Sequence, residues 1–152
     1  MNRRQLLTTL LATAFGAPLI ASAAAAPVID VYKSASCGCC KAWVEHLQKN
    51  GFTVRAHDVA NAPAYRARFG IPEELGSCHT GMVDGYALEG HVPAREIKRL
   101  LAQRPKAVGL AVPGMPQGSP GMETGRSDAY DVVLVQANGR HLVYQHYNDS
   151  TK

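Results

Sequence analysis

Residues 27–50, PVIDVYKSASCGCCKAWVEHLQKN, decide the fold. The β-branched and aromatic residues at the start of this stretch predict a strand over residues 27–34. Ser36 is the expected N-cap of a helix over residues 41–50, in which the apolar residues recur at helical spacing. Between the strand and the helix lies the turn Cys37-Gly38-Cys39-Cys40. The stretch therefore predicts a strand, a cysteine turn and a helix in immediate succession.

The rest of the sequence continues the alternation of strands and helices. The expected elements are a strand at 52–59, a helix at 63–69, a strand at 80–92 that turns near Gly90, a helix at 94–103 behind Pro93, and strands at 131–136 and 140–147 around Asn138-Gly139. Residues 109–125 hold five Gly and three Pro, which predicts a long loop. This order of elements predicts a thioredoxin-like α/β domain with a C-terminal β-hairpin and a long Gly/Pro/Met loop.

The N-terminus predicts export. Arg3 and Arg4 precede an apolar run over residues 6–20, and Ala21-Ser22-Ala23 matches an A-x-A cleavage site. The run is shorter than the roughly 20 residues that a membrane-spanning helix needs. We therefore expect residues 1–23 to be a signal peptide of the Sec or twin-arginine route, and residues 24–152 to be a single metal-binding domain in the periplasm.

The composition of the predicted mature chain narrows the classes of partner. Removal of Arg3 and Arg4 lowers the net charge from +4 to +2, and no basic stripe with interleaved aromatic residues occurs. Nucleic acid is therefore not an expected partner, and neither is a membrane after cleavage of the signal. The sequence also contains no Ser-His-Asp order and no phosphate-binding loop.

Four cysteines carry the candidate chemistry: Cys37, Cys39, Cys40 and Cys78. Three of them lie within four residues, so they do not resemble disulfides that join distant segments. The cysteine turn opens a predicted helix, where free N–H groups and the helix dipole stabilise a thiolate and lower its pKa. Thiolates bind Cu(I) and Zn(II). Three thiols within one turn therefore favour a site for a soft metal ion.

Cys78 and His79 are expected to complete this site. In a thioredoxin-like domain the loop before the third strand faces the cysteine turn, so Cys78 would bring a fourth sulfur and His79 an imidazole. His91 is a candidate for supporting one of these ligands. Met115 and Met122, in the long loop, favour copper over zinc because a thioether binds Cu(I). Packing of the two methionines against the core is the alternative explanation.

Two other functions compete with copper binding. Cys37-x-x-Cys40 has the spacing of a redox pair, which would make the protein a thiol–disulfide oxidoreductase. Cys39 argues against it, since a third thiol between the pair offers a competing disulfide. A zinc-stabilised interaction domain is the third candidate, and the methionines argue against it.

Several motifs occur in order along the chain, namely KSASCGCCK at 33–41, SCHT at 77–80, EGHVP at 89–93, GLAVPGMP at 109–116 and GSPGM at 118–122. Together they resemble the CGCC-motif domain-of-unknown-function family that includes the periplasmic copper-resistance protein CopG. The resemblance implies a cysteine-bridged, multinuclear copper site with Cys37, Cys39, Cys40, Cys78 and His79 as ligands. It also implies a role in copper tolerance through interconversion of Cu(I) and Cu(II). Copper ions and other periplasmic copper-handling proteins are the partners it suggests, and a copper-dependent oxidoreductase activity is left open.

Overall fold

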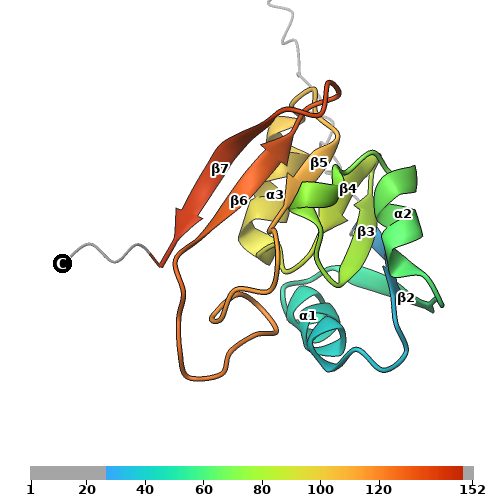
Figure 1. Ribbon diagram of the computed structural model, residues 1–152, viewed down its shortest axis with the longest axis vertical. Helices are drawn as coiled ribbons and strands as arrows, with labels where there is room; N and C mark the ends of the chain where they lie inside the picture. Colours follow the sequence, from blue (N-terminus) through green and yellow to red (C-terminus); the bar gives the residue numbers. More distant parts are fainter. Residues whose placement is uncertain (1–26, 149–152) are drawn as a thin grey trace, which may run out of the picture.

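A seven-stranded mixed sheet forms the centre of the computed structural model, which describes residues 27–148 (Figure 1). The strands are β1 (Val28–Lys33), β2 (Thr53–Asp58), β3 (His79–Val83), β4 (Tyr86–Glu89), β5 (Gly109–Ala111), β6 (Tyr130–Val135) and β7 (His141–Tyr147). Their order in the sheet is β2-β1-β3-β4-β5-β6-β7. The predicted signal peptide lies outside the described residues.

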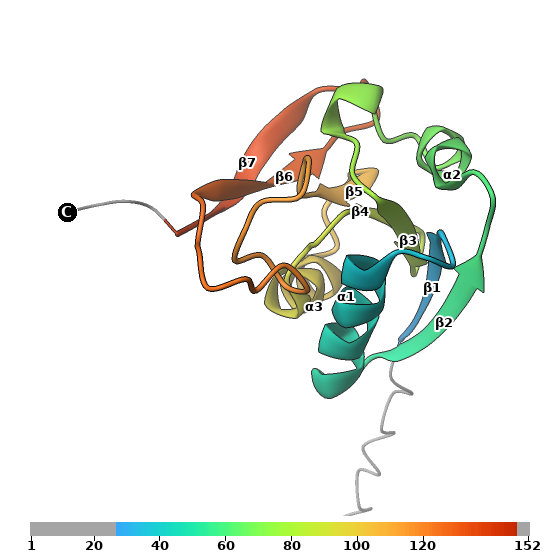
Figure 2. The same cartoon turned by 60° about the horizontal axis from the view of Figure 1, so that its bottom comes forward.

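Three helices cover the two faces of this sheet. They are α1 (Gly38–Lys49), α2 (Ala62–Arg68) and α3 (Ala94–Gln103). The side chains of α1 and α3 share one apolar core on one face, whereas α2 and the short 3-10 helix Glu73–Leu75 border a smaller core on the other (Figure 2). The predicted mixed α/β class is thus confirmed. No helix among the described residues has the length and apolar character needed to cross a membrane.

The first strand and helix place the cysteine turn at the edge of the core. Alternate residues of β1 are buried, and β1 pairs with β2 in parallel and with β3 antiparallel. On α1, Trp43 and Leu47 pack into the core. The N-cap is Cys37, not Ser36 as predicted, because Cys37 Sγ accepts the N–H of Cys40 at 3.3 Å. The helix therefore begins three residues earlier than expected and includes Cys39 and Cys40.

The strand predicted over residues 80–92 is two strands, and the turn between them does not lie near Gly90, where the chain only bends after β4. β3 and β4 form an antiparallel hairpin whose turn is Asp84-Gly85. Both turn residues have positive φ, 47° and 85°, which is the geometry that Asp-Gly favours in a two-residue hairpin. Gly90 follows β4 instead, and also has a positive φ of 70°.

The loop predicted over residues 109–125 begins later than expected. Its first three residues form β5, which pairs with β4 in parallel and with β6 antiparallel. Gly109 permits this pairing, since a Cβ at this position would lie 1.8 Å from the carbonyl oxygen of Ala87. The remaining loop covers residues 112–129. The C-terminal hairpin of β6 and β7 is confirmed, with Gly139 at positive φ in its turn.

Candidate metal centre

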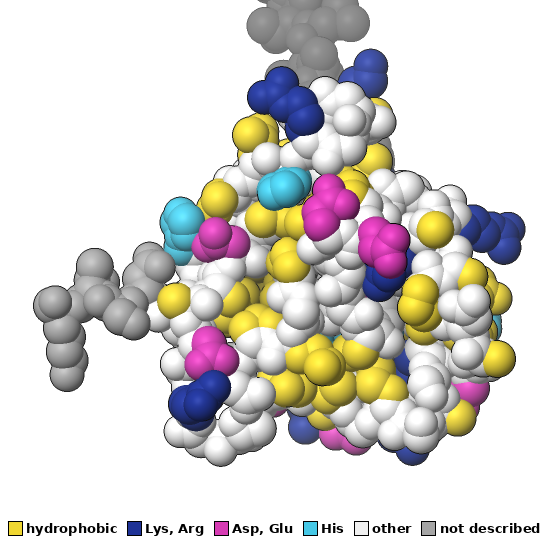
Figure 3. All heavy atoms as spheres, in the orientation of Figure 1, with side chains coloured by type: hydrophobic (Ala, Val, Ile, Leu, Met, Phe, Trp, Pro, Cys, Tyr) yellow, Lys and Arg dark blue, Asp and Glu magenta, His cyan; other side chains and the backbone are white. Residues whose placement is uncertain are grey.

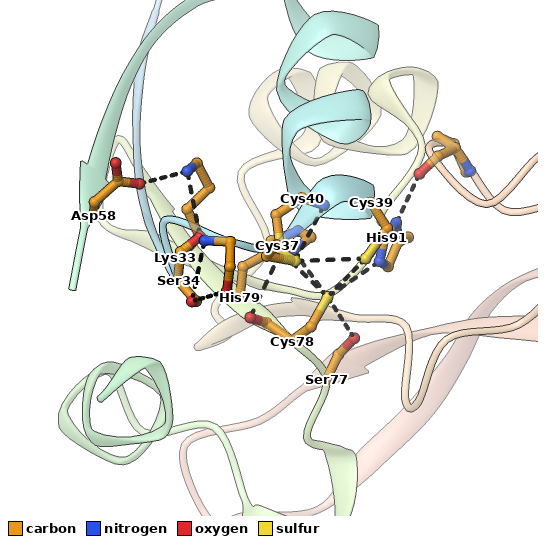
Figure 4. Close-up of a disulfide and its surroundings, with 12 residues drawn as sticks. Lys33, Ser34, Cys37, Cys39, Cys40, Asp58, Ser77, Cys78, His79 and His91 are labelled. Atoms are coloured by element: carbon orange, nitrogen blue, oxygen red, sulfur yellow. Dashed lines mark hydrogen bonds and ion pairs between the residues drawn. A yellow bond between two sulfur atoms is a disulfide. The ribbon is translucent and has the colours of Figure 1, made fainter. Parts of the chain in front are cut away.

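The fold brings the four predicted cysteines to one point (Figure 4). Cys37, Cys39 and Cys40 come from the N-terminal end of α1, and Cys78 immediately precedes β3. Their four sulfurs all lie within 4.8 Å of one another. The loop before the third strand therefore faces the cysteine turn, as the sequence predicts.

Two of the four sulfurs are bonded to each other in this structure. Cys37 and Cys40 form a disulfide, whereas Cys39 and Cys78 are free. The expectation of four thiolates therefore does not describe this state, and reduction of the disulfide is required before all four sulfurs can bind metal. Cys78 Sγ lies 3.5 Å from Cys40 Sγ and 3.7 Å from Cys39 Sγ, so it contacts one sulfur of the disulfide and the other free sulfur.

Two imidazoles join the cluster through Cys78. His79 Nδ1 and His91 Nε2 each lie 3.3 Å from Cys78 Sγ. His91 Nδ1 lies 2.8 Å from the carbonyl oxygen of Pro120, and since a carbonyl only accepts hydrogen bonds, this nitrogen carries the proton. The lone pair of His91 Nε2 is then directed at the cluster. His91, which the sequence suggests only as a supporting residue, thus has the geometry of a ligand equivalent to His79.

Burial keeps both imidazoles neutral, which is the form that binds metal. Burial, with a smaller contribution from His91, lowers the pKa of His79 to about 3, and burial also lowers the pKa of His91. His79 Nε2 is buried and has no hydrogen-bond partner among the described residues. The ring of Trp43 packs against the His79 ring at a centroid distance of 4.4 Å. The other ring nitrogen, Nδ1, lies 3.3 Å from Cys78 Sγ, and an imidazole nitrogen beside sulfur donors fits a site for a soft or borderline metal ion.

Cys78 is protonated in the metal-free protein. Burial, with a smaller effect of neighbouring Cys39, raises the pKa of Cys78 to about 12. A bound metal ion stabilises the thiolate and displaces this proton, so metal binding releases protons at neutral pH.

Buried Glu89 holds the segment that carries Cys78 and His79. One carboxylate oxygen of Glu89 accepts the N–H of Ser77 at 2.7 Å, and the other accepts the hydroxyl of Thr80 at 2.7 Å. These two contacts lie on either side of the Cys78-His79 pair. The carboxylate therefore fixes both ligands from one anchoring point in the sheet.

The loop at residues 112–129 contacts both the centre and α1. Its Pro120 carbonyl binds His91, and Gly121 packs so closely that a Cβ there would lie 2.8 Å from the carbonyl oxygen of Cys39. Figure 3 shows apolar side chains gathered on the lower part of the face where α1 and the loop lie in Figure 1. Of the two methionines, Met122 is partly buried and Met115 is 53% exposed.

The metal-free protein should lose stability on acidification below pH ~6.5. The pKa of His79 is about 3 in the folded chain and roughly 6.5 when the chain is unfolded, so the unfolded state binds more protons between these values. The stabilising contribution is complete above the unfolded pKa and decreases as the pH falls toward the folded pKa. Urea denaturation followed by circular dichroism at several pH values measures how the free energy of unfolding changes with pH. A His79→Asn variant should show a weaker pH dependence, and an equal slope in both proteins would contradict the assignment.

Comparison with known proteins agrees with this centre. The family model described as "Protein of unknown function, DUF411" matches residues 75–122, and a search of curated proteins finds no match. The solved structure of copper resistance protein CopG in form 2 is 51% identical, with a TM-score of 0.77, over 80% of this chain and 98% of that chain. Form 1 is 52% identical, with a TM-score of 0.75, over 79% and 96% of the two chains. Identity at this level over nearly the whole relative places the chain in the DUF411 family, which includes the copper resistance protein CopG.

Proposed function

We propose that the protein is a periplasmic copper-binding protein of copper resistance, which holds a cysteine-bridged, multinuclear copper cluster and interconverts Cu(I) and Cu(II). The observation that carries the proposal is the position of Cys78, whose sulfur belongs both to the four-cysteine group and to a group with His79 and His91. The similarity to CopG supports copper as the metal. Copper is cargo in this proposal, and other periplasmic copper-handling proteins deliver copper to this protein or receive copper from it.

The number and chemistry of the donors support a multinuclear copper site. Six side chains contribute donor atoms to the two overlapping groups, whereas a structural Zn(II) ion takes four. Thiolates favour Cu(I), and imidazoles bind both Cu(I) and Cu(II). A sulfur shared between the two groups is suited to bridging metal ions. The mixed donor set is therefore consistent with both oxidation states of copper.

The proposal includes two features of the whole chain. Residues 1–23 are a signal peptide that directs residues 24–152, one metal-binding domain, to the periplasm. The domain is thioredoxin-like: β1, the cysteine turn, α1 and parallel β2 are followed by α2 and an antiparallel hairpin. In this assignment β5, β6 and β7 extend the sheet beyond the thioredoxin-like core.

A second candidate function is thiol–disulfide exchange. The observation in its favour is the Cys37–Cys40 disulfide at the N-terminal end of α1, which is the position of a redox-active pair. Free Cys39, whose sulfur lies 3.5 Å from Cys37 Sγ, would compete in such exchange. Reduction of insulin disulfides by the metal-free protein tests this alternative.

The reduced, metal-free protein should bind Cu(I) far more tightly than Zn(II), and more than one copper ion per chain. The reason is that bridging thiolates assemble clusters of soft ions. Competition titrations against a Cu(I) chelator and a Zn(II) chelator measure both affinities and the stoichiometry. The same protein with its Cys37–Cys40 disulfide intact is the matched control and should bind less copper. Equal competition by zinc, or a single copper ion per chain, would count against the proposed function.

A further inference from the structure

The disulfide divides the four sulfurs of the centre into two pairs. Cys37 Sγ lies 3.5 Å from Cys39 Sγ, and Cys40 Sγ lies 3.5 Å from Cys78 Sγ. The two free sulfurs, of Cys39 and Cys78, lie 3.7 Å from each other. Each atom of the oxidised pair is therefore in contact with one sulfur that remains available as a ligand.

The donors outside the disulfide still form a site for copper. Cys39 and Cys78 supply two sulfurs, and His79 and His91 supply imidazole nitrogens at 3.3 Å from Cys78 Sγ. Glu89 holds the segment that carries Cys78 and His79, and the Pro120 carbonyl holds His91. Oxidation of Cys37 and Cys40 consequently removes two ligands without removing the site.

The position of Cys37 and Cys40 suits their reduced thiols to giving up electrons. Cys37 caps α1 and its sulfur accepts the N–H of Cys40, so the helix N-terminus stabilises a thiolate there. A thiolate is the form that binds Cu(II) and transfers an electron to it. Cys40 is fully buried and Cys37 is partly exposed, so an ion reaches the pair from the side of Cys37.

We infer that the Cys37–Cys40 dithiol is the internal electron donor that reduces Cu(II) to Cu(I) at this centre; the inference rests on the proposed function. The two thiols lose two protons to solvent and two electrons to two Cu(II) ions, the S–S bond forms, and two Cu(I) ions result. The ions themselves are the oxidant, so no other reactant is needed. Cys39 and Cys78, with the imidazoles, hold the product.

Thiol counting and peptide mapping test the inference independently of any catalytic assay. The fully reduced protein is mixed with Cu(II) without oxygen, Cu(I) is measured with a Cu(I)-specific chelating dye, and the copper-free protein is digested with trypsin. Trypsin releases the three cysteines of the turn in the peptide of residues 34–41, and Cys78 in the peptide of residues 69–95. We expect two Cu(I) ions per chain, a fall from four free thiols to two, and loss of two hydrogen atoms confined to residues 34–41.

Two variants assign the reaction to the pair. His141→Asn removes an exposed potential ligand that belongs to neither donor group, and it should still yield Cu(I) and the disulfide on residues 34–41. Cys40→Ser should lose most of the Cu(I) yield, even though three thiols remain. Equal yields from Cys40→Ser and the unmodified protein, or a disulfide that links residues 34–41 to residues 69–95, would overturn the inference.

A direct titration with Cu(I) separates this inference from the proposed function. If the reduced protein binds Cu(I) but keeps all four thiols after exposure to Cu(II), the dithiol is not the electron donor and copper binding stands. If the reduced protein binds no Cu(I), the proposed function fails and the inference fails with it.

Discussion

Replacement of Cys78 by serine is expected to cause the largest loss of copper binding of any single substitution. Cys78 Sγ is the atom common to both donor groups, within 3.3 to 3.7 Å of Cys39, Cys40, His79 and His91. A hydroxyl is a poor ligand for Cu(I) and does not bridge two soft ions. The loss of affinity should therefore exceed the roughly 10–100-fold that follows loss of a residue that only supports a ligand.

The measurement is a Cu(I) competition titration of the reduced Cys78→Ser protein, with the stoichiometry from metal analysis. His141→Asn is a suitable control, because it removes an exposed potential ligand that belongs to neither donor group. Circular dichroism should show that both variants are folded. If Cys78→Ser retained the full number of copper ions at unchanged affinity, Cys78 would not be a bridging ligand and the two groups would have to act separately.

Gly109→Ala is expected to destabilise the fold by more than about 4 kcal/mol, which is exceptional for one methyl group. The new Cβ would lie 1.8 Å from the carbonyl oxygen and 2.6 Å from the carbonyl carbon of Ala87. Both are backbone atoms of β4, so no side-chain rotation relieves the clash. β4 and β5 would have to separate, and β5 joins the first four strands to the C-terminal hairpin.

Urea denaturation followed by circular dichroism measures this effect. Since a domain of this kind is stable by about 5–15 kcal/mol, a loss of this size should lower the urea midpoint by at least roughly a quarter, and by about four fifths at the lower end of that range. Gly38→Ala is the matched control, because a Cβ at Gly38 has no neighbouring atom within 4 Å and α1 begins there. It should leave stability unchanged or raise it by up to about 1 kcal/mol. Similar midpoints for the two variants would contradict the role assigned to Gly109.

The elements predicted correctly are those in which local sequence and tertiary packing agree. The strand at the start of the chain and the hairpin around Asn138-Gly139 carry both the expected residue types and a clear turn signal. β5 was missed because three residues beside a Gly/Pro-rich segment have no local strand signal. Its extended form depends on pairing with β4 and β6, which lie far from it in sequence.

The hairpin turn at Asp84-Gly85, which the sequence analysis did not predict, explains why His91 is not among the predicted ligands. In the observed hairpin Thr80 pairs with Glu89, and the same register continued by two residues places Cys78 opposite His91. This register follows from a turn at Asp84-Gly85 and is not compatible with a turn near Gly90. Recognition of Asp-Gly as a hairpin signal would therefore have added His91 to the predicted ligands.

The oxidation state of the cysteines could not be predicted from their spacing. Cys37, Cys39 and Cys40 offer several pairings, with or without Cys78, and sequence alone does not rank them. The choice depends on the helix start, since Cys37 is the N-cap and Cys40 lies one turn into α1. Their Cα atoms are 5.3 Å apart, within the range that a disulfide requires.

The contact between Trp43 and His79 gives the protein a built-in optical probe. Trp43 is the single tryptophan of the chain, and its ring lies against an imidazole of the centre. Copper ions quench indole fluorescence at short range. Occupation of the centre should therefore lower the fluorescence intensity of Trp43 in proportion to the copper bound near His79. Arrival and departure of copper can then be followed in real time, in the unmodified protein and without an added dye.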